Sequence, residues 1–186
     1  PDYLQKFVHQ LGKRVADAQK NSTETGSTKL RTFINNVVEG FATSPEGIDQ
    51  LRKRSVMVQA AILSVPLPPE VDQAVRSAYR AICKENEDDM TPVAVRSSAA
   101  GEDSRKKAFA GLQDTFLNMV GEDHVAEAYS WDCASAYNLR SMTYRREAIL
   151  DAMTKAEELG DESIGEQAKK DWAIEGTSLS VCIMQM

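Results

Sequence analysis

The sequence predicts an α/β or α+β fold that is helix-rich and has a small central sheet. Apolar residues recur at helical spacing through most of residues 1–82. Short apolar runs at Val93–Val95, Phe116–Leu117 and residues 179–186 have the length of strands. The chain has 186 residues, which is enough to bury a sizeable core. Its content of 42% hydrophobic and 27% charged residues is ordinary for a globular protein. We therefore expect a few central strands flanked by helices.

The first two predicted helices are defined by their apolar stripes. The first covers about residues 1–20, and the polar stretch Asn21–Lys29 is expected to be a connecting loop. The second helix is expected from Leu30 to Phe41.

Proline and serine mark the limits of the next two helices. Ser44 is expected to cap a third helix that has Pro45 in its first turn and continues to about Leu63. Prolines 66, 68 and 69 then interrupt the chain, and a fourth stripe runs from Val71 to Ile82. Nothing in these four helices suggests chemistry, so packing is their expected role. The acidic stretch that follows, residues 84–90, is expected to be a solvated turn.

Residues 91–120 contain the clearest candidate site. Arg96 is expected where the strand at Val93–Val95 ends and a loop begins, and Gly111 leads into a second strand that starts at Thr115. Arginine presents a planar fork of donors to phosphate oxygens, and small residues allow backbone amides to approach them. This arrangement suits an anionic ligand, although a surface ion pair is the alternative role for Arg96. The chain has no Walker-type glycine loop and no GxGxxG motif.

The remainder of the chain predicts further helices and one strand. A long helix is expected after Asp123, and Asp132 falls within its apolar stripe. Because an unpaired buried charge is costly, we expect Asp132 to form an ion pair with Arg140 or Arg146. Residues 153–170 predict a helix, a turn and a short helix. Residues 179–186 predict a core strand.

Composition excludes several classes of function. The formal charge of −6 argues against a nucleic-acid binder. No run approaches the ~18 apolar residues that a membrane span requires, and no signal peptide is visible. The three cysteines are widely spaced and form no CxxC pair, which favours reduced thiols and a cytoplasmic location. Because the chain begins at Pro1, we expect it to be processed, trimmed or part of a longer protein.

Specific motifs reveal a family resemblance. VAVRSSAAGED and FAGLQDTFLN resemble the VRSSATAED and SFAGQQDTFLN motifs of the phosphoenolpyruvate synthase and pyruvate phosphate dikinase family. SWDCASAYNLRSMTYRREA is similar to the family's CWASLFTDRAISYR segment, and SVCIMQM is similar to its VVVQKM strand. VPLPPEVDQAVRSAY resembles the helix that precedes the first motif. The matches occur in the family's order and extend from about Val56 to Met186.

The resemblance implies part of an ATP-grasp nucleotide-binding domain. It assigns Arg96 to the ATP phosphates, Gly111 to Thr115 to the loop that covers them, and Gln185–Met186 to the hinge beside the adenine. It places no catalytic residue and no metal ligand in this chain, so Mg²⁺ ligands are expected outside it. The implied organisation is a helical segment at 1–90 and a partial nucleotide-binding subdomain at 91–186, together forming one continuous structural unit of a larger protein or complex.

The implied activity is that of an ATP-dependent phosphotransferase of the dikinase type. ATP would phosphorylate a histidine on a separate swivelling domain, in cis or on another subunit, for transfer to pyruvate or another small acceptor. The family's early glycine- and lysine-containing segment and its later acidic strands are absent from these 186 residues. We therefore expect this chain alone to be catalytically incomplete. The alternative hypothesis is a non-catalytic scaffold or interaction subunit derived from a nucleotide-binding domain.

Overall fold

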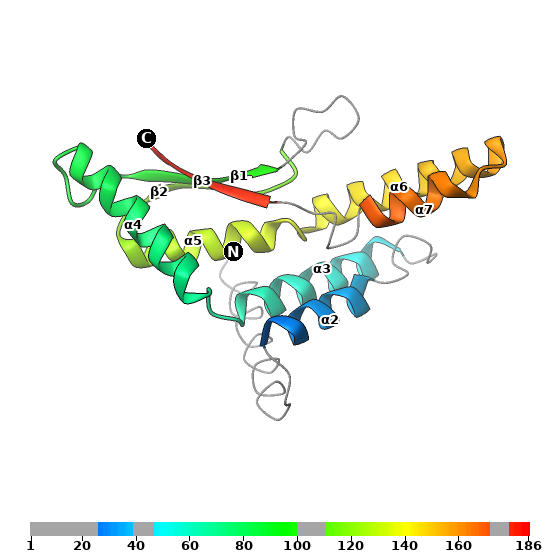
Figure 1. Cartoon of the computed structure of the whole chain (residues 1–186), viewed down its shortest axis with the longest axis horizontal. Coiled ribbons are helices and arrows are strands. Elements are labelled where there is room, and N and C mark those ends of the chain that lie inside the picture. The colour runs from blue at the N-terminus through cyan, green and yellow to red at the C-terminus, as the bar shows by residue number, and fades with distance from the viewer. Residues whose placement is uncertain (1–25, 39–46, 100–110, 172–178) are drawn as a thin grey trace. The chain divides into compact units, whose positions relative to one another are not determined.

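The structure is a computed structural model that describes residues 26–38, 47–99, 111–171 and 179–186 (Figure 1). The predicted first helix, residues 1–20, lies outside this part of the chain. Contacts group the described residues into two units, one within 1–64 and 137–178 and the other within 65–136 and 179–186. The predicted division at residue 90 and the single continuous unit both stay predictions.

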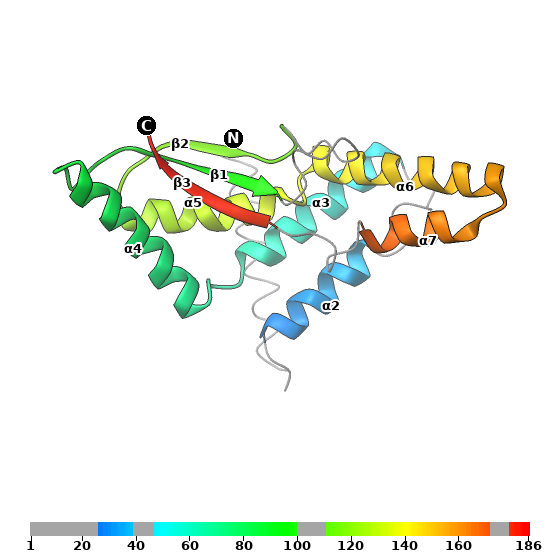
Figure 2. The same cartoon turned by 45° about the horizontal axis from the view of Figure 1, so that its top comes forward.

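The first unit is helical. It contains α2 (Gly26–Val38), α3 (Ile48–Leu63), α6 (Leu139–Leu159) and α7 (Glu162–Asp171). Helix α3 contacts α2 and α6, and α7 packs back along α6 (Figure 2). The predicted turn between α6 and α7 is confirmed, because Gly160 adopts the left-handed conformation that ends α6. The buried apolar side chains of this unit include Ile34, Val37, Leu51, Val58, Met142 and Ile149.

Two helix starts differ from their predictions. Helix α2 begins at Gly26, within the stretch predicted to be a loop. Glycine and serine are poor helix formers, but α2 contacts α3, and tertiary packing of this kind supplies most helical stability. Helix α3 begins at Ile48, and its N-cap is Gly47, whose carbonyl accepts from the amides of Gln50 and Leu51. Ser44, the predicted cap, lies outside the described residues.

The second unit combines three strands with two helices. It contains α4 (Pro69–Glu85), β1 (Val93–Ala99), β2 (Thr115–Met119), α5 (Glu122–Ser135) and β3 (Leu179–Gln185). The strand order is β2-β1-β3, and β1 is antiparallel to both neighbours. The predicted fold class, helix-rich with a small sheet, is therefore confirmed.

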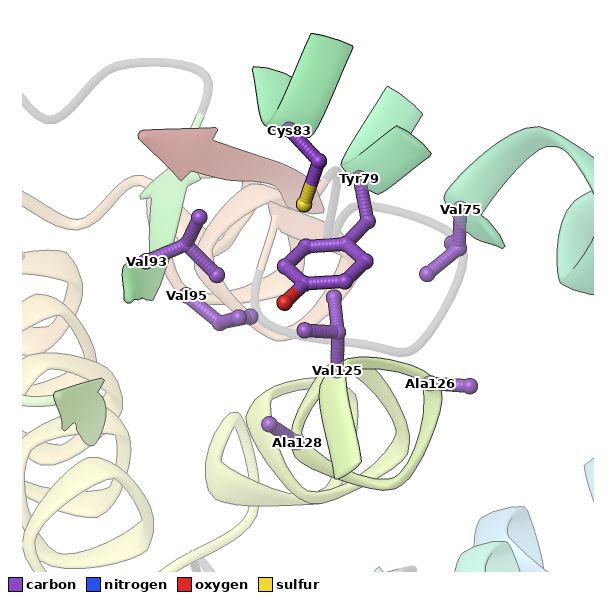
Figure 3. Packing of buried hydrophobic residues seen from close by; sticks show 8 residues of the cluster. All are labelled: Val75, Tyr79, Cys83, Val93, Val95, Val125, Ala126 and Ala128. Atoms are coloured by element: carbon purple, nitrogen blue, oxygen red, sulfur yellow. The ribbon is translucent and has the colours of Figure 1, made fainter. Parts of the chain in front are cut away.

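The core of this unit lies between the sheet and the two helices. Val93 and Val95 of β1 are fully buried against apolar residues of α4 and α5 (Figure 3). Tyr79 of α4 adds two hydrogen bonds: its hydroxyl donates to the Thr91 carbonyl (3.2 Å) and accepts from the Gly121 amide (2.9 Å). One side chain thus fastens the segment before β1 and the segment after β2 to the same helix.

The predicted long helix after Asp123 is interrupted. Helix α5 ends at Ser135, and α6 begins after Asn138. Asn138 has extended backbone angles, φ −64° and ψ 165°, and its side-chain oxygen accepts from the Ser141 amide (2.9 Å). Asparagine favours such a cap because its side chain satisfies an amide that has no partner within the helix. The apolar stripe continues on both sides of the break, which explains why periodicity alone predicts one helix.

Candidate functional site

Strand pairing brings Arg96 and Thr115 together. Arg96 is the direct partner of Thr115 on β2 and of Cys182 on β3. Directly opposed residues in an antiparallel pair project from the same face of the sheet. Arg96 and Thr115 are exposed, whereas the neighbouring Val95 is fully buried on the face that α4 and α5 cover. Arg96 and Thr115 therefore share the face opposite the helices. Gln185 projects from the helix-covered face, because it is the direct partner of the buried Val93.

We call this opposite surface the open face. It carries the alternate residues of the three strands, Ala94, Arg96, Thr115, Leu117, Cys182 and Met184. No described element of this unit packs on it, and the Arg96 guanidinium has no hydrogen-bond or ion-pair partner among the described residues. Leu117 is 53% exposed and Met184 is 46% exposed, so among the described residues the open face combines the Arg96 cation with accessible apolar surface.

The strand that contains Arg96 is longer than predicted. Arg96 was expected where the strand ends, but β1 continues to Ala99. The reason is tertiary, because β3 pairs with β1 continuously from Val93–Gln185 to Ala99–Leu179. Arg96 is thus held in the middle of the central strand, where its backbone is fixed on both sides.

Gly111 precedes β2 and has a conformation that favours glycine. Its φ is +75°, which L side chains rarely adopt, and no heavy atom of the described residues lies within 4 Å of the position that a Cβ would occupy. Backbone conformation, rather than lack of space, therefore requires glycine here. The segment from Gly111 to Thr115 is also anchored to α5, because the Asp114 amide donates to the Ser135 hydroxyl (3.2 Å).

Gln185 and Met186 lie at the far end of β3. Gln185 pairs with Val93, about 10 Å along the strand from Arg96 at ~3.3 Å per residue. The Gln185 side-chain amide donates to the Asn86 side chain. The Met186 amide donates to the Pro92 carbonyl (3.2 Å), and the Met186 sulfur accepts from the Asn118 amide (3.2 Å). In this structure these donors are engaged within the protein.

Asp132 was not among the predicted ligand residues, but its carboxyl is buried without a described hydrogen-bond partner. It is 0% exposed, and neither carboxylate oxygen has a hydrogen-bond partner among the described residues. Burial raises its pKa to about 7, and the nearby Asp114 carboxylate contributes to this rise. The Ser97 amide opposes part of the shift, but it does not lie at hydrogen-bonding geometry.

The predicted ion pair of Asp132 with Arg140 or Arg146 is absent from the described contacts. No arginine contributes to the shift of the Asp132 pKa. An acid within an apolar stripe did signal an unusual residue. Its surroundings could not be predicted, because Asp114 and Ser97 approach it only through the fold.

The described residues contain neither a cluster of metal ligands nor a helix that could span a membrane. Within the ranges given above, no group of three His, Cys, Asp or Glu residues is placed to hold a metal ion. None of the helices described is long and apolar enough to cross a membrane. Cys83, Cys133 and Cys182 are free thiols. Mg²⁺ ligands outside this chain therefore stay a prediction.

A small antiparallel sheet with helices on one face and an exposed arginine on the other is consistent with an α+β nucleotide-binding domain. Comparison with known families agrees, because residues 14–186 match the family described as "Pyruvate phosphate dikinase, AMP/ATP-binding domain". The chain belongs to this family.

Several curated relatives are phosphoenolpyruvate synthases. The probable enzyme of Staphylothermus marinus is 39% identical over 97 residues, which are 51% of this chain and 12% of the relative. The Escherichia coli enzyme is 38% identical over 103 residues, or 55% of this chain and 13% of the relative. A probable enzyme of Methanothermobacter thermautotrophicus is 34% identical over 136 residues, or 73% of this chain and 19% of the relative. The chain thus matches less than a fifth of each of these relatives.

Proposed function

We propose that this chain is the ATP-binding part of a phosphotransferase of the phosphoenolpyruvate synthase or pyruvate phosphate dikinase type. The observation that carries the proposal is the direct pairing of Arg96 with Thr115 on the open face. The pairing sets a guanidinium fork beside a hydroxyl, and both are accessible to an anion. Family membership supports ATP as the anion.

In the proposed complex, the triphosphate lies over Arg96 and Thr115. Arg96 holds phosphate oxygens and offsets charge that develops during transfer. The segment that begins at Gly111 covers the phosphates. The adenine lies toward Gln185 and Met186 at the end of β3. Leu117 and Met184, both exposed on the open face, provide apolar surface for a base in that direction.

The proposed reaction uses domains beyond this chain. A phosphoryl group derived from ATP is transferred to a histidine on a separate swivelling domain, which lies in cis or on another subunit. The phosphohistidine then passes the group to pyruvate or another small acceptor. Mg²⁺ would offset phosphate charge through ligands outside these residues. The division into a helical segment at 1–90 and a nucleotide-binding subdomain at 91–186 is part of the same proposal.

We expect Arg96→Ala to weaken ATP binding by about 10- to 150-fold, the equivalent of ~1.5–3 kcal/mol for a hydrogen bond to a charged group. Isothermal titration calorimetry with ATP and magnesium chloride measures the dissociation constant. The protein should be used at its full natural length. Arg52→Ala is the matched control, because Arg52 is an exposed arginine of α3 and the same charge is removed.

Three outcomes discriminate between the hypotheses. Saturable binding that Arg96→Ala weakens and Arg52→Ala does not weaken would support the site. Equal affinity for all three proteins would place the nucleotide elsewhere. Absence of binding would favour the non-catalytic scaffold, which predicts instead that a partner subunit binds equally well with Arg96 replaced and ATP absent.

A further inference from the structure

A buried carboxyl group lies behind the proposed phosphate site. Asp132 belongs to α5, which packs against all three strands. The groups that influence its carboxyl are the Ser97 amide and the Asp114 carboxylate. Ser97 directly follows Arg96, and Asp114 directly precedes Thr115. Asp132 therefore approaches the two strands, from the helix side, at the same positions where Arg96 and Thr115 project from the open face.

The carboxyl is isolated from compensating charge. It is 0% exposed, and neither oxygen has a hydrogen-bond partner in the described ranges. Asp114, which is half-buried, is the charged group that acts on it. A buried carboxylate beside a second carboxylate is stabilised by taking up a proton.

The other titratable groups on the surrounding elements do not neutralise Asp132. Its neighbours Tyr129 and Cys133 on α5 are themselves uncharged near neutral pH, since burial raises the pKa of both and that of Cys133 to about 11. The arginines of α4 that contact α5 pair with acids in its first turn. These pairs are Arg76–Asp123 and Arg80–Glu122. On the strands, Arg96 of β1 is exposed on the open face, and Cys182 of β3 is a free thiol.

A hydrogen-bond chain also connects Asp132 to the loop side of the site. The Ser135 hydroxyl donates to the Asp132 backbone carbonyl (2.7 Å) and accepts from the Asp114 amide (3.2 Å). The last turn of α5 and the residue before Thr115 are thus held together. The charge of the Asp132 carboxyl acts on Asp114 through space, and this connection holds the backbones of the two segments together.

We propose that protonation of Asp132 controls anion binding on the open face, so that neutral Asp132 permits tight binding of the triphosphate and ionised Asp132 weakens it. The inference rests on the proposed function. Its physical basis is repulsion between like charges separated by one layer of sheet, where water cannot screen them fully. Linkage is reciprocal, so ATP binding must also favour proton uptake by Asp132. With a pKa of about 7, this group changes charge near neutral pH.

The test is the dissociation constant for ATP, measured by calorimetry at several pH values from 6 to 8.5 on the full-length protein. ATP also changes its charge in this range, so the measured quantity is the difference between wild type and variants. Relative to Asp132→Asn, we expect wild-type affinity to fall about tenfold as pH rises, within the usual range for coupled sites. Asp114→Asn should move the fall to lower pH, because it removes a negative charge that raises the pKa of Asp132. Asp89→Asn, an exposed acid, should keep the wild-type profile.

The outcomes separate this inference from the proposed function. Binding with the same pH profile in wild type and Asp132→Asn would overturn the inference and leave the nucleotide site intact. Absence of ATP binding at every pH would overturn both. If Asp132→Asn does not fold, the test is calorimetry of ATP binding to the wild-type protein at pH 7 in two buffers of different ionisation enthalpy. This measures the number of protons that are taken up on binding. Net proton uptake beyond that of the ATP itself would support the inference, and none would refute it.

Discussion

Replacing Tyr79 by alanine is expected to lower the free energy of unfolding by about 3–5 kcal/mol, as for other large aromatic core residues. The ring is 2% exposed and packs with Val93, Val95 and Val125 in the core of the second unit (Figure 3). Its removal leaves a cavity and also deletes both hydrogen bonds of the hydroxyl. Urea denaturation followed by circular dichroism measures the loss.

Tyr79→Phe is the matched control for the cavity. It keeps the ring but leaves the Thr91 carbonyl and the Gly121 amide without the hydroxyl that now pairs them. A buried group left unpaired costs about 1–3 kcal/mol, so this variant should lie between wild type and Tyr79→Ala. An alanine variant as stable as wild type would contradict the described packing of α4 on the sheet.

Asp132→Asn is expected to stabilise the protein at pH 8 by up to about 4 kcal/mol and to have little effect near pH 3.5. The Asp132 pKa is raised from 3.8 to about 7 in the folded state. Below pH 3.8 the carboxyl is protonated in both the folded and the unfolded state. Between the two pKa values the unfolded state loses its proton first, so stability falls with rising pH by ~1.36 kcal/mol per unit. Above pH 7 the free energy of unfolding falls no further from this cause. The asparagine variant does not suffer the decrease, because its side-chain amide does not ionise.

Denaturant unfolding at pH 3.5, 5, 6.5 and 8 measures this difference. Asp151→Asn is the control, because Asp151 is an exposed acid of α6. Its stability should follow that of wild type at every pH. Parallel curves for wild type and Asp132→Asn would show that the Asp132 pKa is the same in the folded and the unfolded state, which would contradict the prediction.

Several helix and strand limits were predicted correctly from residues that are close together in the sequence. Strand β2 begins at Thr115 as predicted, and a turn within residues 153–170 separates α6 from the short α7 as expected. Pro68 and Pro69 correctly marked the start of α4, since proline is tolerated in a first turn. These features depend on residues close together in the chain.

The errors share one cause, which is competition from distant contacts. Periodicity placed one helix across residues 135–139, where the Asn138 cap interrupts it. The strand at Val93 was expected to end at Arg96, but pairing with β3, about 90 residues further along the chain, extends it to Ala99. Asp132 was expected to have an arginine partner, and the fold instead brings Asp114 and Ser97 to it.

The sequence by itself determined the class of fold and the family, because motifs and apolar periodicity are properties of neighbouring residues. It also named Arg96 and Thr115 as candidate ligands. Only the tertiary structure decided that these two residues face each other on a sheet surface that no described element of their unit covers, and that a buried carboxyl lies behind them. Strand register and burial depend on contacts between segments far apart in the chain, and no local pattern specifies those contacts.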